Sequence, residues 1–240
     1  MGPSIGVDWA SGCWVVVAIN DAESVEITTE PAFLNVWHHY RDADTILVDV
    51  PIGLSKTPSR ECDEAAQDFL RDRRSSVFDI PCRRAVETRD YCKARERNGG
   101  SLGSQSWWLL PQIREVDIFL KEKEEAEESI YESHPEVCYE QFARQKDLEP
   151  VGSKQETDGI EARLEVLRAV DETFEGQIRA SLDEYQEKDE WYQRIRSSRF
   201  DDILDAAVLA LTGKKSSEEF AVFPEGRSTE DRCVIVYPSE

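Results

Sequence analysis

At 240 residues the chain is long enough to bury a full hydrophobic core, so we predict a single domain over residues 1–240 with one insertion. The formal net charge of −21 argues against a nonspecific nucleic-acid binder, although at high salt it excludes neither a metal-bridged site nor a locally basic one. Fifty Asp and Glu against 29 Lys and Arg favour a protein adapted to molar salt, as in an extreme halophile.

No apolar run approaches the length of a membrane span, and residues 1–3 lead straight into an expected strand. We therefore expect a soluble, cytoplasmic protein. Its six cysteines are widely scattered and none forms a Cys-x-x-Cys pair, which favours free or buried thiols over a zinc site or a disulfide framework.

The first two expected strands, 5–10 and 13–19, are apolar and are separated by a two-residue turn, the pattern of a hairpin. Residues 25–29 alternate enough to add a third antiparallel strand. The first strand carries Asp8 in its middle. A carboxylate in a core strand costs several kcal/mol unless it is paired, hydrogen-bonded or metal-bound. Asp8 therefore either braces the hairpin or belongs to a site.

A short helix is expected over 32–40, followed by a strand over 45–50 that is nearly all apolar and therefore central. This strand carries Asp49 at its carboxyl end, and the segment Pro51-Ile52-Gly53 then forces an abrupt exit. α/β sheets keep their ligand sites at this position. Capping of the following loop is the structural alternative for Asp49.

Residues 54–120 show helices and loops but no sheet pattern, and Pro111 is expected to begin a helix that runs to about residue 123. Within this segment, residues 71–97 hold nine basic and five acidic side chains, a local charge of +4 in an acidic chain. That reversal favours an anionic partner. Ion pairing of these arginines with the acidic remainder of the protein explains it equally well.

Residues 129–132 are expected to form a fifth strand that ends at Glu132 and repeats the pattern seen at Asp49. His134 follows in a proline-containing loop, either as a hydrogen-bonded structural residue or as a functional one. Residues 156–192 indicate charged surface helices. The last helix, 200–212, is apolar apart from three acids, and the terminal segments 220–224 and 234–237 are extended. The acids of that helix are Asp201, Asp202 and Asp205.

These carboxylates suit one arrangement. The sheet brings Asp8, Asp49 and Glu132 to one edge, and the last helix lays Asp202 or Asp205 across it. Clustered carboxylates need cations to remain ionised, and hard oxygen ligands favour Mg²⁺ or Mn²⁺. Two such ions, about 3.5–4 Å apart, would support phosphodiester cleavage.

Six motifs, in the right order over nearly the whole chain, resemble the domain of unknown function 429 family, described as predicted nucleases of ribonuclease H-like fold. The motifs are Gly6–Ala10, Asp49–Leu54, Arg60–Asp63, Arg74–Phe78, Glu132–Glu136 and Asp201–Ala206. The resemblance implies an α/β fold: a ribonuclease H-like mixed five-stranded sheet with flanking helices and a large helical insertion at about 55–125. It also implies divalent metal held by Asp8, Asp49, Glu132 and Asp202 or Asp205.

The same motifs and the local positive charge predict a substrate-binding set composed of Arg74, Ser75, Ser76, Arg83 and His134. The sequence thus favours a metal-dependent nuclease whose partner is nucleic acid or a nucleotide. Two alternatives stay open. One is a nucleotide-binding or phosphotransfer protein, against which the lack of a Gly-rich phosphate loop counts. The other is a non-enzymatic interaction protein that uses the charged segment 156–192 as its partner surface.

Overall fold

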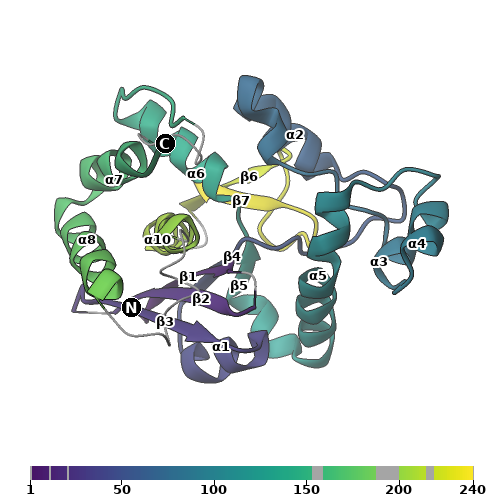
Figure 1. Cartoon of the computed structure of the whole chain (residues 1–240), viewed down its shortest axis with the longest axis horizontal. Coiled ribbons are helices and arrows are strands. Elements are labelled where there is room, and N and C mark those ends of the chain that lie inside the picture. The colour runs from purple at the N-terminus through teal and green to yellow at the C-terminus, as the bar shows by residue number, and fades with distance from the viewer. Residues whose placement is uncertain are drawn as a thin grey trace.

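The computed structural model describes residues 2–10, 12–20, 22–152, 159–187, 200–214 and 219–239. Within these residues the chain folds into a mixed five-stranded sheet with helices on both faces, and a two-stranded sheet lies beside it (Figure 1). This is the α/β class that the family resemblance implies.

The large sheet has the order β3-β2-β1-β4-β5. β1 (Ser4–Trp9), β2 (Trp14–Ile19) and β3 (Val25–Glu30) form the predicted antiparallel meander. β4 (Thr45–Val48) pairs parallel with β1, and β5 (Ile130–Glu132) pairs parallel with β4. Three antiparallel strands followed by two parallel ones agree with a ribonuclease H-like sheet.

The two faces of the sheet are covered by different helices, so the molecule has three layers. Val15, Val17 and Leu47 point to one face and pack in the core cluster that contains the apolar side chains of the last helix. Ile5, Val7 and the other alternate strand residues point to the opposite face. The first face is covered by α6 (Pro135–Gln145), α7 (Gly159–Val170), α8 (Glu172–Glu187) and α10 (Phe200–Gly213), and the second by α1 (Phe33–Tyr40) and α5 (Ser104–Glu122).

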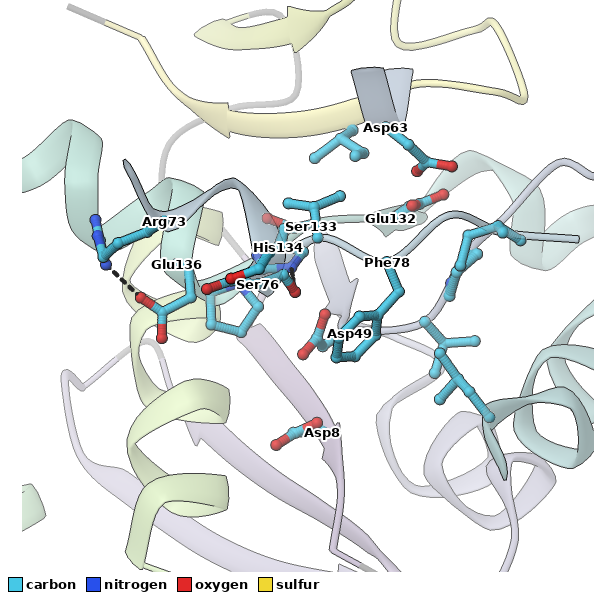
Figure 2. A pocket seen from close by; sticks show the side chains of 18 of the residues that line it. Asp8, Asp49, Asp63, Arg73, Ser76, Phe78, Glu132, Ser133, His134 and Glu136 are labelled. Carbon is cyan, nitrogen blue, oxygen red and sulfur yellow. Dashed lines mark hydrogen bonds and ion pairs between the residues drawn. The ribbon is translucent and has the colours of Figure 1, made fainter. Parts of the chain in front are cut away.

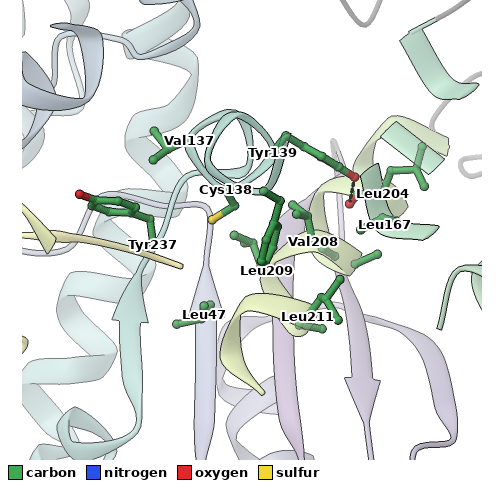
Figure 3. Close-up of a cluster of buried hydrophobic side chains, with 14 of the residues drawn as sticks. Leu47, Val137, Cys138, Tyr139, Leu167, Leu204, Val208, Leu209, Leu211 and Tyr237 are labelled. Atoms are coloured by element: carbon green, nitrogen blue, oxygen red, sulfur yellow. Dashed lines mark hydrogen bonds between the residues drawn. The ribbon is translucent and has the colours of Figure 1, made fainter. Parts of the chain in front are cut away.

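α10 is the central helix of the first layer. Figure 3 shows Val208 and Leu209 of α10 between α6 and the strands, and the Tyr139 hydroxyl of α6 donates to the Leu204 carbonyl oxygen at 2.7 Å. The residues of α10 from 203 onward are buried, which explains why the sequence of this helix is apolar on nearly every side.

The connection from β4 to β5 contains the predicted helical insertion. It comprises α2 (Glu61–Leu70), the 3₁₀ segment η1 (Arg71–Ser76), α3 (Arg83–Val86), α4 (Tyr91–Arg97), α5 and the 3₁₀ segment η2 (Glu124–Glu128). In Figure 1, α3 and α4 lie beyond α5, on the side away from the sheet.

The predicted start of α5 is wrong. The helix begins at Ser104, and Pro111 lies inside it. A proline at this position removes one backbone hydrogen bond and disfavours a continuous helix. The helix continues nonetheless because Leu110, Ile113 and Val116 are fully buried against the sheet, and this packing outweighs the local cost.

The terminal segments 220–224 and 234–237 form an antiparallel pair, β6 (Phe220–Phe223) and β7 (Ile235–Pro238). A bridge between Ser133 and Val236 joins this pair to the end of β5. Of the charged segment expected over 156–192, the part within α7 and α8 is helical as predicted, while 156–158 and 188–192 lie outside the described residues. Among the described helices none has the length and apolar character needed to cross a membrane.

Candidate metal centre

Asp8 and Asp49 lie side by side because β1 and β4 are parallel neighbours. Val7 is in register with Val48, and the Asp49 backbone N–H donates to the Val7 carbonyl oxygen at 2.9 Å. The next residue of each strand is therefore an aspartate, and the pleat places both side chains on the face that α10 covers. Asp8 is buried and Asp49 half-buried. Asp8 Oδ1 also accepts from the Trp9 backbone N–H at 2.7 Å.

Asp205 joins these two carboxylates from α10. One oxygen of each of Asp8, Asp49 and Asp205 lies within 4.8 Å of the others, and Asp205 is buried. Gly6 makes this approach possible, since a Cβ at Gly6 would lie 1.9 Å from the Ala206 carbonyl oxygen. Three of the five predicted metal ligands thus come together in a group that we call the carboxylate triad.

The triad fits a hard divalent cation. Oxygen ligands at about 2.0–2.6 Å from a common ion are separated by at most about 5 Å, and the triad oxygens satisfy this limit. Carboxylates are the ligand type that Mg²⁺ and Mn²⁺ prefer. Three acidic groups at such short range, two of them buried, also repel one another strongly, and a divalent cation relieves that repulsion.

Glu132 is the main correction to the predicted ligand set. In the parallel pair of β4 and β5, Glu132 is in register with Val48, one residue short of Asp49. Because successive strand residues point to opposite faces, Glu132 points away from the face that carries the triad. It lies instead among the groups that surround Arg60.

Arg60, Asp63 and Glu132 form a buried charged group. Arg60 donates from Nη2 to Glu132 Oε1 at 2.6 Å and from Nη1 to Glu132 Oε2 at 2.8 Å, and its Nε donates to Asp63 Oδ2 at 2.9 Å. Glu132 Oε2 also accepts from the Ile52 backbone N–H at 2.6 Å. The group thereby holds the loop that follows Asp49.

The pKa values in this group follow from burial and from pairing. Burial raises the pKa of the Glu132 carboxyl, and the nearby Arg60 guanidinium only partly opposes it. Burial works against the charged form of Arg60, but Glu132 and Asp63 more than offset it, so the pKa of Arg60 lies well above its ordinary value. Both oxygens of Glu132 are engaged by Arg60, which accounts for its position outside the triad.

Of the two predicted helix acids, Asp205 is the one that lies beside Asp8 and Asp49. Asp202 lies three residues earlier on α10, is half-buried, and is not part of the triad. Asp201 is half-buried as well.

A pocket of about 550 Å³ is lined by two members of the triad, Asp8 and Asp49 (Figure 2). Phe78, Ile80 and Leu109 contribute an apolar wall. Among the described residues that line the pocket, the charge is mainly negative, with two guanidinium groups, those of Arg60 and Arg73, against six carboxylates. The carboxylates belong to Asp8, Asp49, Asp63, Asp72, Glu132 and Glu136.

The structure places only some of the predicted substrate-binding residues in the pocket. Ser75, Ser76 and His134 line the pocket, and His134 Nε2 donates to the Ser76 carbonyl oxygen at 3.3 Å. Arg74 is exposed and lines a neighbouring groove, together with Ser75. Arg83 does not line the pocket, because it forms a two-pronged ion pair with Asp117 at 3.0 and 3.2 Å.

Of the basic segment 71–97, Arg73 lines the pocket, and it is paired with acids, as the structural alternative predicts. Arg73 donates to Glu136 Oε2 and to Glu140 Oε2, each at 2.5 Å. Arg60, Asp63 and Arg73 were not among the predicted site residues. The Arg60–Asp63 spacing of three on one helical turn is the available signal for the first two. Nothing in the sequence marks Glu136 as the partner of Arg73.

The fold and the triad together define an α/β protein with a ribonuclease H-like sheet and a candidate divalent-metal centre. The chain belongs to the family described as protein of unknown function (DUF429), whose model matches residues 6–229. No curated protein and no solved structure matches it.

Proposed function

We propose that the protein is a metal-dependent nuclease that cleaves phosphodiester bonds with Mg²⁺ or Mn²⁺ held by Asp8, Asp49 and Asp205. The observation that carries the proposal is the position of the triad, whose oxygens lie within 4.8 Å of one another at the carboxyl end of two parallel strands. Two of its members, Asp8 and Asp49, line the pocket. Ligand sites of α/β sheets lie at this end of the strands.

A divalent ion at this position supplies a Lewis acid for a phosphoryl oxygen and makes a bound water more acidic. The protein groups have separate tasks. The three aspartates would hold the cation from two strands and a helix, so the core fixes the relative positions of the ligands. The Arg60 group holds the loop after Asp49 through the Ile52 N–H and carbonyl oxygen. Ser75, Ser76 and His134 supply polar groups to the lining of the pocket.

The charge of the pocket affects how a phosphate-containing partner would bind. Six carboxylates against two paired arginines among the described lining residues give a phosphate diester little direct attraction, so its binding would depend on a divalent cation held by the triad. The volume of about 550 Å³ is that of a site for a small molecule or a nucleotide, which favours a nucleotide or a strand end over a long duplex.

The test is a cleavage assay in molar KCl with MnCl₂, using end-labelled single-stranded DNA and RNA and the small diester bis(p-nitrophenyl) phosphate. We expect cleavage by the wild type, its loss on chelation, and its loss in Asp8→Asn. Retained cleavage in a folded Asp8→Asn variant would exclude the triad as the catalytic centre.

Two controls separate this proposal from the alternatives. The variant Asp183→Asn removes an exposed acid of α8 and should cleave as the wild type does. The second control is titration with ATP. Saturable ATP binding without cleavage of any diester would favour the nucleotide-binding or phosphotransfer alternative. Absence of both activities would favour an interaction protein.

A further inference from the structure

Two thiols from distant parts of the sequence are in contact near the buried charged group of Arg60, Asp63 and Glu132. Cys62 lies in the first turn of α2, and Cys233 lies just before β7. Their Sγ atoms are 3.9 Å apart, a separation too short for any other atom to lie between them. A disulfide has a sulfur–sulfur distance of about 2.05 Å, so the two atoms need to approach by roughly 1.9 Å.

The two thiols differ in accessibility. Cys62 is fully buried, whereas Cys233 is half-buried. A small oxidant therefore reaches Cys233 first. The hydrogen bond from Cys62 lowers the pKa of the Cys233 thiol, and the Arg60 guanidinium acts in the same direction. The hydrogen bond to Cys233 and burial raise the pKa of Cys62. Cys233 is thus the better nucleophile and Cys62 the resolving thiol.

We propose that Cys62 and Cys233 form a reversible disulfide when the protein meets a hydroperoxide, which links α2 to the segment before β7. The Cys233 thiolate attacks one peroxide oxygen, the O–O bond breaks, and the leaving oxygen takes a proton. Cys233 is then a sulfenic acid. The Cys62 sulfur attacks the Cys233 sulfur, the S–O bond breaks, and the oxygen leaves as water with the Cys62 thiol proton. With hydrogen peroxide, two thiols and one peroxide give one disulfide and two waters.

The surroundings favour this pair over the other cysteines. Cys138 is buried with its Sγ 3.3 Å from the Ser133 hydroxyl oxygen, and Cys82 donates to the Arg97 carbonyl oxygen at 3.4 Å. Cys92 is exposed on α4, in the outlying part of the insertion. The new bond would join two residues 171 positions apart in the sequence and so restrict the unfolded chain strongly.

The inference does not depend on the metal chemistry, and mass spectrometry tests it directly. The reduced protein is treated with hydrogen peroxide in small excess, its remaining thiols are alkylated, and the digest is analysed without reduction. We expect a peptide pair joined through Cys62 and Cys233, with a mass about 2 Da below the sum of the two thiol peptides. Dithiothreitol should separate the pair.

Cys92→Ser is the matched control and should give the same linked peptides as the wild type. Cys233→Ser removes the more accessible partner and should give none. The oxidised wild type should unfold at a temperature higher by roughly 5 °C or more, and Cys233→Ser should show no such shift. Oxidation that stops at Cys92 or at single sulfinic acids, with no Cys62–Cys233 link in the folded wild type, would overturn the proposal.

Discussion

Gly6 of β1 lies directly against Ala206 of α10. A Cβ at position 6 would be 1.9 Å from the Ala206 carbonyl oxygen and 2.4 Å from the Ala210 backbone nitrogen. Both obstacles are backbone atoms of a buried helix, so they cannot move aside as a flexible side chain would. This close approach is what brings Asp205 to Asp8, two residues further along β1.

The first prediction is that Gly6→Ala separates α10 from the sheet. We expect it to lower the free energy of unfolding by about 3 kcal/mol or more, at the upper end for overpacked sites, because the helix must shift as a whole. Urea denaturation measures this loss. Where the variant still folds, it should also bind Mn²⁺ more weakly, since Asp205 moves with the helix.

Gly176→Ala is the matched control. Gly176 lies in α8, is exposed, and has nothing within 4 Å of an added Cβ. Because alanine favours a helix over glycine, this variant should be more stable by about 0.5–1 kcal/mol. If Gly6→Ala and Gly176→Ala changed the free energy of unfolding equally, the packing of α10 would not depend on the missing side chain at Gly6.

The second prediction concerns the buried charges around Arg60. Replacing Arg60 by methionine leaves Glu132 and Asp63 in the core without their guanidinium partner. The expected cost is about 3–5 kcal/mol, because the remaining buried carboxylates are not compensated. Urea denaturation is again the measurement, and adding Glu132→Gln to the Arg60→Met variant should recover part of the loss.

Arg83→Met is the comparison for that experiment. Arg83 also forms a two-pronged ion pair, with Asp117, but its side chain is 32% exposed. Asp117 keeps the Lys121 ammonium, 2.7 Å from its Oδ2, as a partner, so the expected cost is below about 1 kcal/mol. A loss in Arg60→Met no larger than that in Arg83→Met would contradict the role given to Arg60.

The third prediction is a pH dependence at Asp171. Burial raises the pKa of this carboxyl, but the Phe174 backbone N–H, which donates to Oδ1 at 2.9 Å, and the Lys214 ammonium, 3.1 Å from Oδ2, more than offset it. The folded pKa is therefore below the unfolded value of about 3.9. The stabilisation by Asp171 is present above that value and is lost as the pH falls through the folded pKa.

Asp171→Ala should accordingly be less stable than the wild type by about 1 kcal/mol at pH 6–7, the usual contribution of a capping side chain. The difference should shrink as the pH is lowered below about 4. Asp183→Ala, at an exposed position of α8, is the comparison variant for the loss of one surface carboxylate. A difference for Asp171→Ala that stays constant from pH 7 to pH 3 would rule out the ionised carboxylate as its source.

The sequence predicts the strands and α10 well because their signals are local. The apolar runs of β1, β2 and β4 and the nearly all-apolar α10 need no knowledge of the partners. Asp8 and Asp49 can also be predicted as site residues from the sequence, since each interrupts or ends a buried strand. The start of α5 cannot be predicted from the sequence, because the packing of Leu110, Ile113 and Val116 outweighs the cost of the proline inside the helix.

The limits of the site prediction have a physical cause as well. Glu132 and Asp49 follow the same sequence pattern, but Glu132 is in register with Val48 and not with Asp49. This difference of one residue turns the Glu132 side chain to the other face of the sheet. Pairings across long sequence separations, such as Arg60 with Glu132 and Arg73 with Glu136, leave no local signal. They decide which of the predicted charges are already paired within the protein.

The most direct test of the carboxylate triad is calorimetric titration of Mn²⁺ into the wild type and single Asp→Asn variants at positions 8, 49, 205 and 183, in molar KCl. The account predicts saturable binding in the wild type and in Asp183→Asn, and roughly a tenfold or greater loss of affinity in each of the other three. Weak binding that is equal in all five proteins would contradict a metal centre at Asp8, Asp49 and Asp205.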